Sequence, residues 1–178
     1  MEWLGLQLFA ELPATGQIVI DCRHEPLLII LAYIVVSAAA FATLDMAERQ
    51  CHSENDNARR QWRILGACCL AGGIWALHFI SMLAFHAPLE THYDAALTGL
   101  SLLLALLASW FAMHSLERHV MSPRHYLQAA TFIGLGVTLM HYVGMAAMKT
   151  SAVQYYQTSL LLASLLIAIV ASLLALVM

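Results

Sequence analysis

An all-α, polytopic transmembrane helical bundle is the fold that this sequence predicts, and its composition, its apolar blocks and an internal repeat indicate it. Of its 178 residues, 61% are hydrophobic and 11% are charged, whereas a soluble domain carries about 45–50% apolar and about 25% charged residues. A helix needs about 20 predominantly apolar residues to cross a bilayer, and it satisfies its own backbone hydrogen bonds there. The five stretches that are long enough comprise residues 27–47, 62–86, 95–116, 127–148 and 158–178.

The segment that precedes the first span is expected to be separate from the bundle. Residues 1–20 contain Glu2 and Glu11 and lack a basic beginning, so they do not have the pattern of a signal peptide. Their apolar run ends at Pro13 and is too short to span. We therefore expect an extracytoplasmic or interfacial segment over residues 1–20 and the transmembrane domain over residues 21–178.

The positions of the basic residues predict how the bundle is oriented. Loops on the cytoplasmic side of a membrane are enriched in Lys and Arg. Six of the eight basic residues follow the first or the third span, which makes these loops cytoplasmic and places the N-terminus outside. The net charge of −3 and the lack of a basic stripe give no indication of nucleic-acid binding. The six residues are Arg49, Arg59, Arg60, Arg63, Arg118 and Arg124, and the other two are Arg23 and Lys149.

The chain repeats itself with an offset of 63 residues. His78-Phe-Ile-Ser-Met82 matches His141-Tyr-Val-Gly-Met145 at this offset, and Ser101 matches Ser164. An offset of 69 carries His24 onto Tyr93, because six further residues fall in a polar loop near residues 53–57. The predicted unit is a helical hairpin that starts at the outer surface and returns through a helix carrying the histidine motif. Two hairpins are complete and the fifth span begins a third, so a fragment of a larger domain is expected.

Each motif places an imidazole and a thioether on one helix face. Histidine and methionine four residues apart share a face, and His141, Met145 and Met148 are expected within an arc of about 60°. Both ligand types are neutral and suit a soft metal, above all Cu(I). Haem is the competing cofactor, because His and Met are both axial ligands of haem iron. The predicted metal ligands are His78, Met82, His141, Met145 and His24, with Met140, Met148 and His86 as secondary candidates.

Helix packing is the alternative explanation of these motifs. An intramembrane histidine can bridge helices by hydrogen bonding, and methionine is a common packing residue. Ionisable residues within a membrane are costly, however, and usually serve a function. Two histidines at equivalent repeat positions, each followed by Met, favour a ligand or cofactor site. No nucleophile–base set or phosphate-binding loop occurs in the sequence, so this segment is expected to be non-catalytic.

The segments LHFISMLAF (77–85) and MHYVGMAAM (140–148) resemble the MHYT family of bacterial integral membrane sensor domains. The resemblance implies six or seven helices, and three motif copies near the outer face of the cytoplasmic membrane. It also implies a copper site that senses oxygen, carbon monoxide or nitric oxide, and cytoplasmic GGDEF and EAL domains that act on cyclic di-GMP. Leu77 replaces the family's Met in the first copy, Val143 replaces its Thr in the second, and a third copy is missing.

A membrane sensory input domain is therefore the predicted function. Copper bound near the outer face would respond to a diatomic gas, or to a redox or metal signal, and regulate a cyclic di-GMP output domain in the same chain. The lipid bilayer is the expected surrounding, and a homo-oligomer is compatible with this function. Two alternatives stay open at this point: a copper transport or delivery module, and a haem-binding electron-transfer protein.

Overall fold

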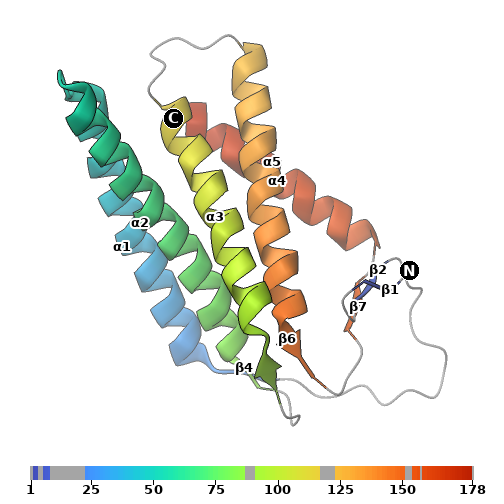
Figure 1. Ribbon diagram of the computed structural model, residues 1–178. Helices are drawn as coiled ribbons and strands as arrows, with labels where there is room; N and C mark the ends of the chain where they lie inside the picture. Colours follow the sequence, from blue (N-terminus) through green and yellow to red (C-terminus); the bar gives the residue numbers. More distant parts are fainter. Residues whose placement is uncertain are drawn as a thin grey trace, which may run out of the picture.

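Five long helices dominate the computed structural model, which describes residues 2–3, 6–8, 23–86, 91–116, 123–150, 154–156 and 158–177 (Figure 1). Each of the five is long and apolar enough to cross a membrane. The chain is thus a multi-pass membrane protein, and the predicted helical bundle is confirmed. The helices are α1 (Pro26–His52), α2 (Asp56–Leu83), α3 (Ala95–Ser115), α4 (Pro123–Ala147) and α5 (Thr158–Val177).

Local sequence signals explain where the helices begin. Pro26 occupies the first turn of α1, where its missing N–H costs nothing. The Asn55 side chain accepts a hydrogen bond from the backbone N–H of Asn57, and Asp94 accepts from the N–H groups of Ala96 and Leu97. Such side chains satisfy donors that a helix start leaves unpaired.

The helix boundaries correct two of the predicted spans. Helix α2 begins at Asp56 rather than at residue 62, because its polar first turns continue the helix beyond the apolar stretch. The turn between α1 and α2 is consequently only residues 53–55. At their other ends α2 stops at Leu83 and α4 at Ala147, so His86 and Met148 lie outside the helices that were expected to carry them.

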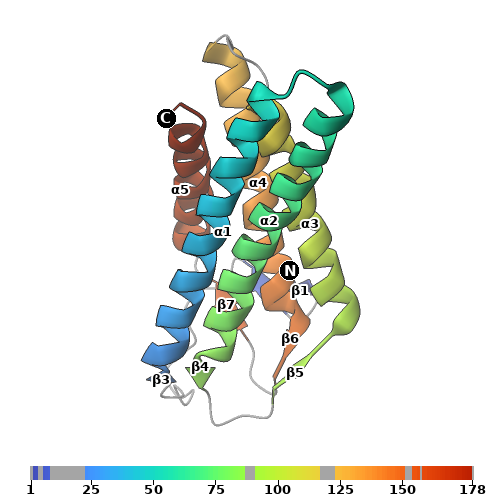
Figure 2. The same ribbon diagram turned by 90° about the vertical axis from the view of Figure 1, so that its left-hand side faces the viewer.

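Short strands close the two hairpins at one end of the bundle, here called the strand end (Figure 2). β3 (Arg23–His24) pairs with β4 (Phe85–His86), and β5 (His92–Tyr93) pairs with β6 (Met148–Lys149), both antiparallel. The backbone N–H of Glu25 donates to the carbonyl of Ala84, and that of Asp94 to the carbonyl of Ala147, both at 2.8 Å. The two closures are equivalent at the repeat offsets, which supports the hairpin repeat.

A separate three-stranded sheet has the order β1-β2-β7. β1 (Glu2–Trp3) is antiparallel to β2 (Leu6–Leu8), and β2 is parallel to β7 (Gln154–Tyr156). The prediction that residues 1–20 lie at the membrane surface falls largely outside the described residues.

The helices pack in chain order, and small residues set their separation. Within the hairpins α1 packs on α2 and α3 on α4, while α2–α3 and α4–α5 contacts join the array. A Cβ added to Gly136 would lie 2.7 Å from Ala108 Cβ, and one added to Gly134 would lie 2.8 Å from Ile169 Cα. Small residues allow this close approach of helices in membranes. The buried core, formed by Ala71, Ala105 and Met140, lies among α2, α3 and α4.

Helix α5 is the least enclosed of the five. It lies inclined across the other helices (Figure 1), and none of its described residues is buried. Its large apolar side chains are mostly exposed, for example Leu166 and Ile167, as are Tyr33 and Ile34 on α1. Such apolar surfaces are rare on soluble monomers and match a lipid environment.

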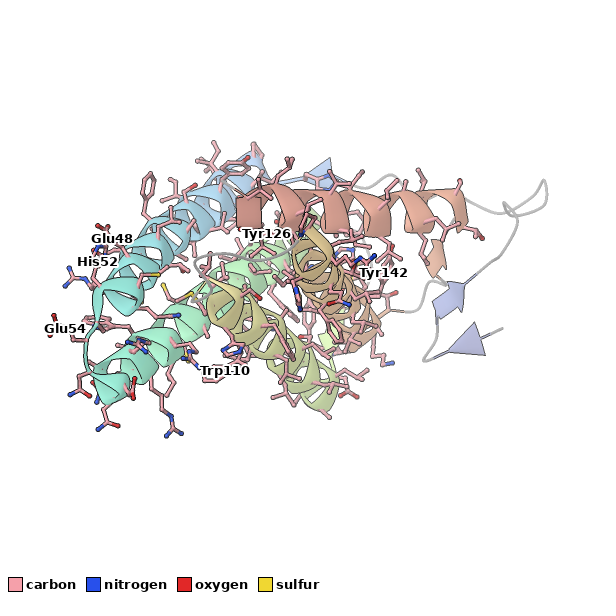
Figure 3. All side chains as sticks on the ribbon, turned by 90° about the horizontal axis from the view of Figure 1, so that it is seen from above. Glu48, His52, Glu54, Trp110, Tyr126 and Tyr142 are labelled. Carbon is pink, nitrogen blue, oxygen red and sulfur yellow. The ribbon has the colours of Figure 1, made fainter. Side chains whose placement is uncertain are left out.

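The end opposite the strands, here called the basic end, contains the turn between α1 and α2. Arg49 stacks over the Trp62 ring, and Arg63 over the Trp110 ring. Glu48, His52 and Glu54 lie on the rim of this end, away from the interior of the bundle (Figure 3). These polar groups are therefore separate from the histidine motifs.

Candidate metal centre

The two motif histidines meet between α2 and α4. His78 Nδ1 and His141 Nδ1 are 3.2 Å apart, and the ring centroids are 4.8 Å apart with planes at 66°. The offset of 63 residues that relates the motifs in the sequence therefore joins them in space. The two Nδ1 atoms are within hydrogen-bonding distance, with one ring as donor and the other as acceptor, so without an ion the pair bridges α2 and α4 by a hydrogen bond.

Gly144 makes room for the His78 ring. A Cβ at residue 144 would collide with His78 Nε2 and lie 2.8 Å from His78 Cδ2. His78 is buried, and its Nε2 has no hydrogen-bond partner among the described residues. The small residue of the second motif thus allows the first motif's ring to pack directly on the α4 backbone.

The separation of the two nitrogens is compatible with a shared metal ion. Imidazole nitrogen binds metals such as zinc at about 2.0–2.1 Å, so two nitrogens 3.2 Å apart are close enough that both could hold one ion. The donor types that the motifs offer, imidazole and, one helical turn further on in the sequence, thioether, suit a soft monovalent ion.

The motif methionines lie one helical turn beyond the histidines. Met82 on α2 is buried, and Met145 on α4 is half-buried. Within the described part of the chain, no group of three His, Cys, Asp or Glu side chains could hold a metal ion. Further ligands would therefore come from sulfur, as the spacing of the motifs predicts, or from outside the described residues.

Of the remaining predicted ligands, His24, His86 and Met148 lie away from the pair, whereas Met140 does not. His24 packs against Phe85, with ring centroids 5.4 Å apart, beyond the end of α2 at Leu83. From His78 to Leu83 the helix rises about 7.5 Å. His86 lies in β4 and Met148 in β6, so the expected arc on α4 includes His141 and Met145 but not Met148. Met140 is in the buried core with Ala71, and it also lines the groove that contains His78 and His141.

A groove of about 410 Å³ leads to the histidine pair from the side of α5. His141 is exposed at its edge, whereas His78 is buried. The walls are mainly apolar, with a few hydroxyl groups near the rings. The lining residues are Ile74, Leu77, His78, Ser81, Val137, Thr138, Met140, His141, Tyr142, Ser164 and Ala168.

Two hydrogen bonds near the site were not predicted from the sequence as functional contacts. The Tyr142 hydroxyl is 3.0 Å from Ser164 Oγ, and Trp75 Nε1 donates to Ser101 Oγ at 3.1 Å. Ser101 and Ser164 match at the repeat offset. That match was the available signal, but the sequence does not say which residue each serine contacts.

This geometry defines a class of protein: a membrane bundle of repeated helical hairpins in which one histidine from each repeat contributes to the same candidate site. The chain belongs to the MHYT family, described as a bacterial signalling protein N-terminal repeat, whose sequence model matches residues 72–130 and 134–178. Each matched segment begins within a histidine-bearing helix and continues through the next one. The family's repeat is therefore the same unit as the hairpin inferred above, but it is counted from the second helix of each hairpin rather than from the first.

Curated relatives of the chain are bacterial signalling proteins. It is 47% identical to the cyclic di-GMP phosphodiesterase NbdA of Pseudomonas aeruginosa, over 99% of this chain and 22% of the relative. It is 37% identical to the bifunctional diguanylate cyclase/cyclic di-GMP phosphodiesterase MucR of the same species, over 84% and 22%. It is 25% identical to the signaling protein YkoW of Bacillus subtilis, over 86% and 19%.

The chain thus spans about a fifth of the length of these relatives. No solved structure matches it.

Proposed function

We propose that this chain is the copper-binding sensory input of a longer signalling protein and that it controls a cyclic di-GMP enzyme domain in the same polypeptide. The observation that carries the proposal is the pair of repeat-related histidine nitrogens at 3.2 Å, each followed one turn later by methionine. The names of two relatives refer to enzymes of cyclic di-GMP synthesis or breakdown. Those activities supply the proposed output.

The residues of the site have distinct roles in this proposal. His78 and His141 would hold the ion through their Nδ1 atoms, and Met82 and Met145 would supply sulfur. Gly144 keeps the His78 ring in place. A bound copper ion supplies an open coordination position for oxygen, carbon monoxide or nitric oxide. The groove beside α5 would give such a small apolar gas a path from the bilayer.

The basic residues support a particular orientation of the site. Arg49, Arg59, Arg60 and Arg63 lie near the turn between α1 and α2, and clusters of this kind favour the cytoplasmic side. The basic end would then face the cytoplasm of a bacterial inner membrane. The histidine pair, β3 and the N-terminus would lie toward the outer side.

The geometry favours a sensor over the two alternative functions. A copper transporter requires ligands along its whole path, but Cys68 on the basic half of α2 is exposed on the surface. Cys69 there is directed to the Ala39 carbonyl, at 3.6 Å. Haem held between His78 and His141 would need its ring plane between two imidazoles whose centroids are 4.8 Å apart. A small ion fits that separation better.

Metal analysis of the chain in lipid nanodiscs tests the copper proposal. Copper supplied as Cu(I) should bind at about one ion per chain, and the double variant His78→Ala/His141→Ala should lose it. His52→Ala is the matched control, because His52 lies on the exposed rim of the basic end. Equal copper content in the double variant and the parent would contradict the proposal. A Soret band after haem-replete expression would favour haem instead.

A further inference from the structure

Each serine of the repeat pair connects a histidine-bearing helix to the helix that follows it. Ser101 on α3 accepts a hydrogen bond from Trp75 on α2, and Ser164 on α5 pairs with Tyr142 on α4. Both serines donate their own proton to a carbonyl three residues earlier. These are the carbonyls of Thr98, at 2.7 Å, and Leu161, at 2.8 Å. Since a hydroxyl has one proton, the Tyr142 hydroxyl is the donor to Ser164.

The two contacts occupy equivalent places but differ in the aromatic donor. The residue equivalent to Tyr142 in the first motif is Phe79, which has no hydroxyl. Trp75, one turn earlier, packs on Phe79 with centroids 4.5 Å apart and supplies an N–H instead. The repeat therefore retains the serine and its link to the previous helix, although the sequence of the motif has changed. This retention indicates that the link matters.

The two contacts differ in how far their serines are buried. Ser101 is fully buried among packed helices. Ser164 is exposed, and α5 has no buried residue along its described length. Figure 3 shows Tyr142 on α4 directly beside α5. Helix α5 packs mainly on α4, closely at Gly134 and Ile169, so a change in the Tyr142–Ser164 bond can tilt α5 about that contact, whereas α3 is held between α2 and α4.

Tyr142 is also in direct contact with the histidine pair. Its ring meets the His141 ring edge to face, with centroids 5.2 Å apart, and His141 Nδ1 faces His78 Nδ1. Reorientation of the His141 ring therefore changes the space in which the Tyr142 ring lies. A chain of contacts runs from His78 through His141 and Tyr142 to Ser164.

We propose that Tyr142 is a positioning residue that transmits occupancy of the histidine pair to α5 through its hydrogen bond to Ser164. This inference rests on the proposed copper site, and it identifies α5 as the helix that responds. Capture of an ion by His141 changes the Tyr142–Ser164 bond, and α5 tilts relative to α3. Helix α5 is inclined across the bundle, and its C-terminal end lies nearer the basic end than its beginning does (Figure 1), so a change of tilt moves that end relative to the basic end.

Pulsed electron paramagnetic resonance on the full chain in nanodiscs measures this tilt. In a background with all four cysteines changed to alanine, Leu103→Cys on α3 and Leu174→Cys on α5 carry nitroxide labels, because both leucines are exposed. Cu(I) is delivered anaerobically as its acetonitrile complex. The expected result is a copper-dependent shift in the α3–α5 distance that disappears in Tyr142→Phe and in Ser164→Ala, with unchanged copper content in both variants.

Matched variants separate transmission from general stability. Ser164→Thr keeps a hydroxyl and should retain the shift. Tyr126→Phe on α4 should retain it too. So should Ser172→Ala on α5, because the Ser172 hydroxyl bonds the Ala168 carbonyl within its own helix.

Two outcomes would overturn the proposal about Tyr142. The first is a full shift in Tyr142→Phe, and the second is a parent that binds copper with no shift, which leaves the copper site intact. A parent that binds no copper would refute the proposed function and, with it, this inference.

Discussion

Gly144 illustrates how a residue without a side chain can shape the proposed metal site. Its missing Cβ is what allows the His78 ring to rest against α4, because an added Cβ would be 2.8 Å from His78 Cδ2. The Cβ would be fixed to the backbone of α4, which cannot shift as easily as a side chain, so the His78 ring would have to move. The position of one imidazole thus depends on the absence of a methyl group from the neighbouring helix.

Replacing Gly144 with alanine should weaken copper binding by about tenfold or more, in the range measured for residues that orient metal ligands. The displaced His78 ring would no longer face His141 Nδ1 at the observed distance. Competition titration with a Cu(I) chelator in nanodiscs measures the affinity. Gly72→Ala is the control, because a Cβ there meets nothing within 4 Å. Equal affinities for the two variants would show that Gly144 does not position the ring.

Single residues also show the limits of sequence reasoning at the site. The match at offset 63 predicted that His78 and His141 share a site, and the predicted proximity is confirmed by their 3.2 Å separation. Whether they bind copper stays a prediction. The Tyr142–Ser164 bond could not be predicted, because it depends on the rotation and tilt of α4 and α5. Periodicity identifies a helix face but not the atom that it meets.

At the level of elements, the end of α1 supports the end of α3. Gln50 is fully buried, and its Nε2 donates to the Met113 carbonyl at 3.0 Å. That carbonyl lies in the last turn of α3, where no intrahelical N–H is available to it. Met113 in turn packs against Gly66 of α2. Three helices therefore depend on one amide side chain at the basic end.

Gln50→Ala should lower the free energy of unfolding by about 1 kcal/mol, because the lost hydrogen bond and side-chain packing outweigh the removal of Gln50 Oε1, a buried acceptor without a partner among the described residues. Gln61→Ala provides the comparison, because Gln61 is exposed on α2 and surface changes usually stay within about 0.5 kcal/mol. Equilibrium denaturation of both variants in the same detergent micelles gives the difference. A Gln50 variant as stable as the Gln61 variant would contradict this role for the amide.

The elements themselves were predictable in number and order, but their ends were not. Five apolar stretches gave five helices, because length and hydropathy decide whether a segment crosses a bilayer. The strands β4 and β6 have two residues each, too few for any alternation of polar and apolar residues. Placing His86 and Met148 on helices was wrong for this reason.

For the whole molecule, the distribution of charge and the position of the site lead to one arrangement in the membrane. Basic side chains gather around the turn between α1 and α2, while the paired strands lie at the other end. The proposed orientation therefore fixes which side of the membrane each turn faces. It also decides whether the proposed metal site lies toward the outer or the inner compartment.

Cysteine labelling in spheroplasts should reveal this orientation. In the cysteine-free background, Thr91→Cys near β5 should react with a membrane-impermeant maleimide. Ser53→Cys in the turn between α1 and α2 should react only after the cells are permeabilised. Reaction of Ser53→Cys in intact spheroplasts, with Thr91→Cys protected, would mean that the bundle is inserted in the opposite sense.

The pairing of His78 with His141 has a consequence for how such a centre can arise. The two ligands occupy the same position in successive repeats and present the same atom to each other. A single ancestral hairpin with one such histidine would therefore supply the only ligand residue that the pair requires. Two identical copies related by a twofold axis could assemble it across an isologous interface. Gene duplication would then require no new ligand residue. Later substitutions, such as Phe79 at the position equivalent to Tyr142, could specialise the two halves independently.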